Sequence, residues 1–151
     1  AAPHLFDGIA GWQAQGPTDL EAAARGYVTR AGKSPGLAIV ISDLLAPSWE
    51  GGLRALLRHR HEVALIHLLA PEEVSPPMGE ELRLLDRETG RYVEIHLDAF
   101  ALDAYAQRFA TWTGAIERFC ADHRIGYARM NSDTPVETVL FDVLRKRRIL
   151  A

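Results

Sequence analysis

The fold of this chain is decided by the stretch Gly36-Leu37-Ala38-Ile39-Val40-Ile41-Ser42-Asp43-Leu44-Leu45. Five consecutive apolar residues, three of them β-branched, follow a glycine and stop at Ser42-Asp43. Such a run is typical of a strand that is buried on both faces of a parallel sheet. Amphipathic helical patterns flank the run on both sides. We therefore interpret it as the central strand of an α/β layer fold.

Two further runs predict parallel strands beside 36–42. Residues 63–69 are apolar except for His67, and a last short strand is predicted over 125–130. Helices are predicted wherever apolar residues recur at three- and four-residue steps. This pattern gives helices over 4–15, 18–31, 49–61 and 99–123, and one from Thr134 onward. The sequence thus predicts a sheet with helices on both faces.

A β-hairpin is predicted between the second and third of these strands. Residues 82–86 and 92–97 flank a charged segment with Gly90, which favours a turn at that glycine. The hairpin is expected to extend the sheet or to cross its rim. Residues 72–81, which include two consecutive prolines, are predicted to be a loop.

Composition indicates one soluble globular domain over residues 1–151. The chain is 48% hydrophobic and 25% charged, with a formal net charge of −3. This charge gives no overall attraction to nucleic acid or to an anionic membrane. The single cysteine, Cys120, excludes an internal disulfide and fits a reducing compartment. No apolar run approaches the roughly 20 residues of a membrane helix.

Thr18 and Asp43 are the candidate site residues. Asp43 ends the strand 36–42, and Thr18 opens a predicted helix in the capping-box pattern that Glu21 completes. Ligands of open α/β sheets bind at the carboxyl ends of the strands, where both residues are expected to lie. A hydroxyl and a carboxylate there could hold Mg²⁺, which prefers oxygen ligands. The alternative is structural: Thr18 caps its helix, and Asp43 fixes a loop.

Other reactive side chains have structural interpretations. His59 and His61 are two residues apart, which does not place them on one helix face. His67 in an apolar strand is interpreted as a core residue with its hydrogen bonds satisfied, and Cys120 as an inert buried thiol. Asp133, after the last strand, is expected to support the final capping turn. The sequence has neither a glycine-rich phosphate loop nor a Gly-x-Ser-x-Gly elbow.

Five segments, taken together, resemble the C-terminal part of a bacterial family filed as domain of unknown function fifty-eight. They are Gly16-Pro17-Thr18-Asp19-Leu20, Ile41-Ser42-Asp43, Glu62-Val63, Leu84-Leu85-Asp86-Arg87-Glu88-Thr89-Gly90 and Ser132-Asp133-Thr134-Pro135. The resemblance implies a von Willebrand factor type A-like domain, a doubly wound, Rossmann-like fold. Such domains build a metal-ion-dependent adhesion site from an Asp-x-Ser-x-Ser, a later Thr and a later Asp.

Thr18 matches the second segment of that site and Asp43 the third. The Asp-x-Ser-x-Ser is absent from these 151 residues, and Pro17 stands where the family commonly has Gly. We therefore expect a truncated domain whose first strand and first helix lie upstream. Residues 36–42 should then show an open hydrophobic edge. With only two protein oxygens, the 151-residue chain should bind Mg²⁺ weakly.

The resemblance implies a non-enzymatic protein-binding module. In the parent protein, a divalent cation would be completed by an acidic residue of a partner, such as a MoxR-type AAA ATPase. Membrane helices in the missing N-terminal segments would place the domain at the cytoplasmic face of the membrane. Two alternatives stay open: a metal-dependent enzyme that uses Asp43, and a structural domain without bound metal. An upstream catalytic nucleophile would favour the enzyme, and an upstream Asp-x-Ser-x-Ser the adhesion-type site.

Overall fold

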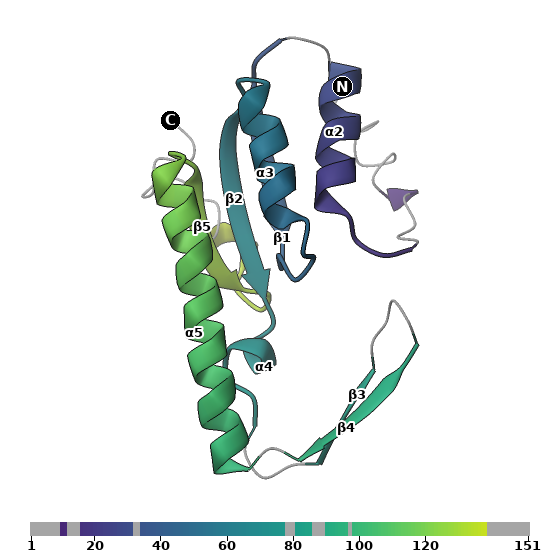
Figure 1. Cartoon of the computed structure of the whole chain (residues 1–151), viewed down its shortest axis with the longest axis vertical. Helices are drawn as coiled ribbons and strands as arrows, with labels where there is room; N and C mark the ends of the chain where they lie inside the picture. Colours follow the sequence, from purple (N-terminus) through teal and green to yellow (C-terminus); the bar gives the residue numbers. More distant parts are fainter. Residues whose placement is uncertain are drawn as a thin grey trace.

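The structure is a computed structural model that describes residues 10–11, 16–31, 34–77, 81–85, 90–96 and 98–138. Three parallel strands form one sheet in the order β1-β2-β5 (Figure 1). Their bounds are Leu37–Ser42 for β1, Glu62–Leu69 for β2 and Gly126–Asn131 for β5. Each predicted strand is therefore confirmed to within one residue at either end, and so is the α/β fold class.

The helices alternate with these strands along the chain (Figure 1). They are α2 (Leu20–Ala31), α3 (Trp49–Arg58), α4 (Pro71–Val74), α5 (Ala99–Asp122) and α6 (Val136–Thr138). The predicted helix over 4–15 lies outside the described residues except for residues 10–11, and the final helix is described only at α6. Among the described helices, none has the length and hydrophobicity that crossing a membrane requires.

Helix α4 overlaps the start of the predicted loop 72–81, so that prediction is wrong at its start. Pro71 occupies the first helical position, where its missing N–H is no loss. The carboxylate of Glu73 accepts a hydrogen bond from the backbone N–H of Ala70 at 2.7 Å. One helical turn is stable here because both of its ends are satisfied locally.

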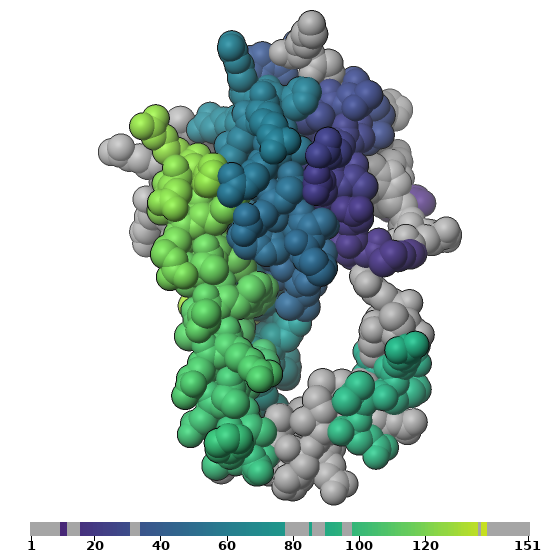
Figure 2. Space-filling model, viewed as in Figure 1, coloured from purple at the N-terminus to yellow at the C-terminus, as the bar shows by residue number. Residues whose placement is uncertain are grey.

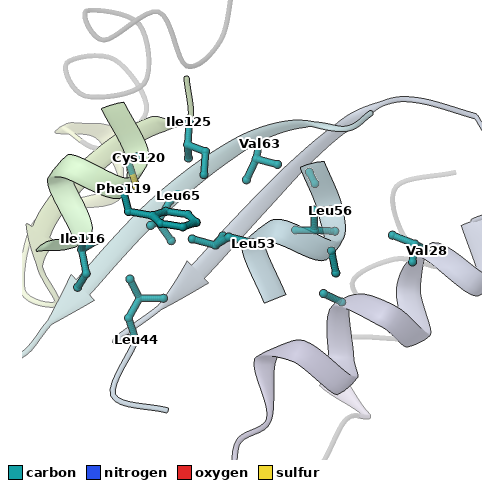
Figure 3. Close-up of a cluster of buried hydrophobic side chains, with 13 residues drawn as sticks. Val28, Leu44, Leu53, Leu56, Val63, Leu65, Ile116, Phe119, Cys120 and Ile125 are labelled. Atoms are coloured by element: carbon teal, nitrogen blue, oxygen red, sulfur yellow. The ribbon is translucent and has the colours of Figure 1, made fainter. Parts of the chain in front are cut away.

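The main core lies on one face of the sheet, beneath α2, α3 and α5 (Figure 3). Alternate residues of β2 face these helices, because side chains of a strand alternate between its two faces. The buried side chains of this cluster include Val28, Leu53, Leu56, Val63, Leu65, Ile116 and Phe119. Burying apolar area of this kind contributes about 25 cal/mol per Å² and dominates the stability of the layer.

The opposite face distinguishes β1 from the other two strands. Ala64, Ile66, Ala128 and Met130 of β2 and β5 form a second buried cluster there. On β1 the equivalent positions are exposed, Ile39 to 46% and Ile41 to 63%. The sequence predicted that this strand is buried on both faces, which is wrong for the described part of the chain. Among the described strands β2 is central and β1 is the edge.

The edge position of β1 confirms the open hydrophobic edge that was expected for 36–42. Within the described part of the chain, β1 pairs with β2 alone. A groove of about 400 Å³ between β1 and α2 is lined by apolar side chains such as Tyr27, Leu37 and Val40. Unpaired backbone groups flanked by apolar side chains are a site for strand addition or aggregation.

The predicted hairpin forms, but as a sheet of its own. Strands β3 (Glu81–Leu85) and β4 (Tyr92–His96) pair in antiparallel register, with Leu84 opposite Val93. Gly90 has a φ of +71°, a conformation that favours glycine. The hairpin projects beyond the carboxyl ends of the parallel strands and stands apart from α2 and α3 (Figures 1 and 2). It does not extend the main sheet, contrary to one of the two placements expected for it.

Candidate functional site

Asp43 lies at the carboxyl end of β1 on a turn that its own side chain stabilises. Its Oδ1 accepts a hydrogen bond from the N–H of Leu45 at 3.1 Å, an Asx-turn. The hydroxyl of Ser42 accepts a second bond from the N–H of Leu44 at 3.0 Å. Leu44 has a φ of +56°, and its side chain is buried. The carboxylate of Asp43 is therefore exposed at the end of the strand, where the sequence places it, and it also fixes the loop, as the structural alternative predicted.

His67 supports this turn from inside the molecule. Its Nε2 lies 3.0 Å from the carbonyl oxygen of Asp43, and its Nδ1 lies 3.0 Å from the hydroxyl of Tyr127. The side chain is completely buried, and this burial lowers the pKa of His67 below its usual value. The interpretation of His67 as a satisfied core residue is confirmed. Its contact with a candidate site residue was not predicted.

Thr18 does not cap the helix that follows it. Helix α2 begins at Leu20, and the residue before it, Asp19, accepts a hydrogen bond at Oδ1 from the N–H of Ala22 at 3.0 Å. Asp19 is therefore the N-cap, and the predicted capping box of Thr18 and Glu21 is wrong. Glu21 pairs with Arg25 instead. Threonine and aspartate are both good caps, so sequence alone placed the helix start too early by about one residue.

Ser48 joins the segment after Thr18 to the loop after Asp43. The Ser48 hydroxyl accepts a hydrogen bond from the N–H of Leu20 at 3.0 Å, across 28 residues of sequence. The pKa of Asp19 is lowered by the hydrogen bond from Ala22 and, second, by one from Ser48. The start of α2 and the loop 43–48 thus lie side by side at the carboxyl edge of the sheet. Sequence reasoning missed Ser48 because it is also the residue that precedes helix α3.

The other reactive side chains of the sequence analysis do not form a metal-binding group among the described residues. Within the described ranges, no group of three or more His, Cys, Asp or Glu side chains could hold a metal ion. Asp133 is exposed in the turn after β5. Cys120 is buried, and this burial raises the pKa of its thiol to about 12, as expected for an inert residue. His61 is buried beside the carbonyl oxygen of Gly36, whereas His59 is exposed.

Comparison with known proteins identifies the family. The profile described as "Protein of unknown function DUF58" matches residues 4–113, a range that includes Thr18, Asp43 and His67. The chain belongs to the DUF58 family. This DUF58 chain is 31% identical over 134 residues to the uncharacterized proteins Rv1480 of Mycobacterium tuberculosis and Mb1516 of Mycobacterium bovis. It is 35% identical over 98 residues to the uncharacterized protein MAV169 of Mycobacterium avium.

These matches differ in how much of each protein they cover. They include 86% of this DUF58 chain but 42% of Rv1480 and of Mb1516. For MAV169 the shares are 64% and 57%. The chain therefore spans roughly half or less of the length of these bacterial relatives. No solved structure matches it.

The capping assignment predicts which substitution near the site affects folding. In the parent protein, Asp19→Ala should lower the midpoint of thermal unfolding, whereas Thr18→Ala should leave the cap intact. Asp19→Asn should retain the cap, since an amide oxygen can accept the same bond. An unchanged midpoint in Asp19→Ala would contradict the assignment.

The charge of Asp19 adds a pH dependence to this test. Its pKa is lower in the folded chain than in the unfolded chain, so its contribution is present above the unfolded pKa of about 3.9. The contribution is lost as the pH falls through the folded pKa. Thermal unfolding at about pH 7 and about pH 3 should therefore show a smaller pH effect in Asp19→Asn than in the natural chain.

Proposed function

We propose that this DUF58 chain is the C-terminal part of a von Willebrand factor A-like domain that binds a protein partner without catalysing a reaction. Thr18 and Asp43 would belong to its metal-ion-dependent adhesion-type site. The observation that supports this proposal best is the exposed carboxylate of Asp43, held at the carboxyl edge of β1. The loop that carries it is docked through Ser48 on the helix start that follows Thr18.

The side-chain oxygens of Thr18 and Asp43 are suitable ligands for a hard cation such as Mg²⁺, provided that further ligands complete its coordination. The turn engages Oδ1 of Asp43, and no described residue hydrogen-bonds its Oδ2. Two protein residues leave most of the octahedral positions of Mg²⁺ to upstream residues, waters and a partner. The 151-residue chain alone should therefore bind Mg²⁺ weakly, and calorimetry showing tight binding would contradict this ligand set.

The expected partner is a protein that offers one exposed Asp or Glu. A cation held by neutral hydroxyls and few carboxylates keeps an excess of positive charge, which an external carboxylate can neutralise. The family resemblance suggests a MoxR-type AAA ATPase in this role. It also suggests that upstream membrane helices place the domain at the cytoplasmic face of the membrane. The net charge of −3 gives no support to a nucleic-acid partner.

The metal-dependent enzyme that would use Asp43 as a base has less support. Catalysis requires a positioned nucleophile, base or activated water beside the substrate. His67, which contacts Asp43, has both ring nitrogens engaged, and the Cys120 thiol is buried with a raised pKa. These two groups therefore offer no partner for base or nucleophilic chemistry at Asp43.

Affinity capture with the whole parent protein tests the proposal. Lysate of the native host should be passed over the immobilised protein in Mg²⁺ and again in EDTA, and the retained proteins compared by mass spectrometry. Selective loss of an ATPase in EDTA would support the adhesion-type site. A set of partners that chelation leaves unchanged would contradict it and favour a structural domain without bound metal.

A further inference from the structure

The backbone of Asp43 is held by a side chain at the point where β1 leaves the sheet. The parallel register of β1 and β2 ends with Ser42 opposite His67. One residue later, the carbonyl oxygen of Asp43 accepts its hydrogen bond from the ring of His67 at 3.0 Å. The imidazole thus continues the pairing of the two strands by one step, at the residue that carries the candidate ligand.

The two hydrogen-bond partners of His67 determine which of its ring nitrogens carries the proton. A carbonyl oxygen can only accept, so Nε2 of His67 carries the proton that it donates to Asp43. In the neutral ring Nδ1 is then the acceptor, and the hydroxyl of Tyr127 donates to it at 3.0 Å. Two consecutive hydrogen bonds, from Tyr127 to His67 and from His67 to Asp43, therefore connect all three parallel strands, from β5 through β2 to the end of β1.

The ring of His67 is also held in place by packing. It meets the ring of Trp112 edge to face, with centroids 5.1 Å apart and planes at 86°. The side chain has no exposed surface. A side chain with both ring nitrogens bonded and its ring packed against Trp112 of α5 is held in one orientation. It can therefore fix the position of the group to which it donates.

The turn needs such support because part of it is strained. Leu44 has a left-handed backbone conformation, which is unfavourable for a non-glycine residue and persists only where the surroundings enforce it. The burial of the Leu44 side chain and the hydrogen bond from His67 to Asp43 anchor the turn on both sides of one peptide bond. The direction of the Asp43 carboxylate follows from the orientation of this peptide.

We infer that His67 is a positioning residue for Asp43: its hydrogen bond to the Asp43 carbonyl sets the direction in which the carboxylate is presented at the sheet edge. As a statement about metal binding, this inference rests on the proposed function. As a statement about the turn, it stands without any metal. Outer contacts that orient a ligand typically change metal affinity by about 10–100-fold, and a contact with the ligand's backbone should give the lower end of this range.

Three variants of the parent protein separate positioning from general stability. His67→Phe keeps the ring against Trp112 but removes both hydrogen bonds. His67→Gln keeps a side-chain N–H donor for the Asp43 carbonyl and alters the contact with Tyr127. Val63→Ala, at the opposite end of the same strand, removes buried apolar atoms without touching the turn. It serves as the control for loss of core stability.

Two measurements are made on each variant. The first is amide hydrogen exchange of Leu44 and Leu45 without added metal, because their N–H groups bond to the turn itself. The second is the affinity for Mg²⁺ alone, by calorimetry. We expect exchange at both amides to be faster in His67→Phe than in Val63→Ala, and Mg²⁺ affinity to be about tenfold lower. His67→Gln should recover most of both values.

The outcomes distinguish the inference from the function on which it builds. Equal exchange at Leu44 and Leu45 in His67→Phe and Val63→Ala would overturn the inference, whatever the metal does. Faster exchange in His67→Phe that His67→Gln restores would support it. If the variants give that exchange pattern but the natural protein binds no Mg²⁺, the positioning of Asp43 stands and the proposed adhesion-type site fails.

Discussion

Asp43→Asn in the whole parent protein should abolish Mg²⁺-dependent binding of the protein partner while leaving the fold intact. Asparagine keeps an oxygen that can accept the hydrogen bond from the N–H of Leu45, so the turn is preserved. It removes the negative charge, which a hard cation requires from its strongest ligand. The loss should exceed the roughly 10–100-fold that outer contacts of a metal site contribute.

Two further variants make this expectation specific. Asp43→Ala should lose the binding as well and, in addition, about 1 kcal/mol of stability, because the turn loses its hydrogen bond. Asp133→Asn removes the exposed carboxylate after β5 at the same edge of the sheet and should leave the binding unchanged. Partner binding measured by surface plasmon resonance in Mg²⁺ would test all three. Full binding by Asp43→Asn would exclude Asp43 as a metal ligand.

Gly52→Ala should lower the free energy of unfolding by about 2 kcal/mol, although glycine is ordinarily a poor helix residue. A Cβ at Gly52 would lie 2.8 Å from both the carbonyl oxygen and the Cγ of Leu20. Leu20 cannot move aside easily, because its N–H is bonded to Ser48 and its helix is capped by Asp19. The glycine is therefore required for the close contact of α3 with the start of α2.

Gly114→Ala in α5 is the matched control. A Cβ there would meet the guanidinium of Arg118 at 3.4 Å, the end of a flexible side chain. This alanine should raise the free energy of unfolding by about 0.5–1 kcal/mol through helix propensity alone. Urea denaturation of both variants gives the comparison, and a stabilising Gly52→Ala would mean that α2 and α3 are not in close contact.

The strands were predictable because their signal is local. β1 and most of β2 are continuous apolar runs, and β5 alternates the buried Ala128 and Met130 with the exposed Arg129. The role of β1 as an edge was not predictable from its own residues. Leu37, Ile39 and Ile41 have the composition of a buried strand, but they are exposed in the described part of the chain, where β1 pairs with β2 alone.

The candidate site was predictable only in part, for the same reason. Asp43 was found because the end of a strand can be located from sequence, and its Asx-turn spans two residues. The contacts of His67 with Asp43 and Tyr127 span 24 and 60 residues, so no local pattern predicts them. The helix cap was misplaced because adjacent residues, Thr18 and Asp19, both fit the cap pattern.

The two connections between paired parallel strands differ in length, and this difference affects how easily each pair forms during folding. The connection between β1 and β2 contains 19 residues, 43–61, whereas the connection between β2 and β5 contains 56, residues 70–125. For flexible chains, closing the longer connection costs about 1 kcal/mol more in entropy. The hairpin and α5 both lie within that longer connection. The loop-closure entropy therefore favours pairing of β1 with β2. Pairing of β5, the strand that carries Tyr127, with β2 has the larger entropic cost.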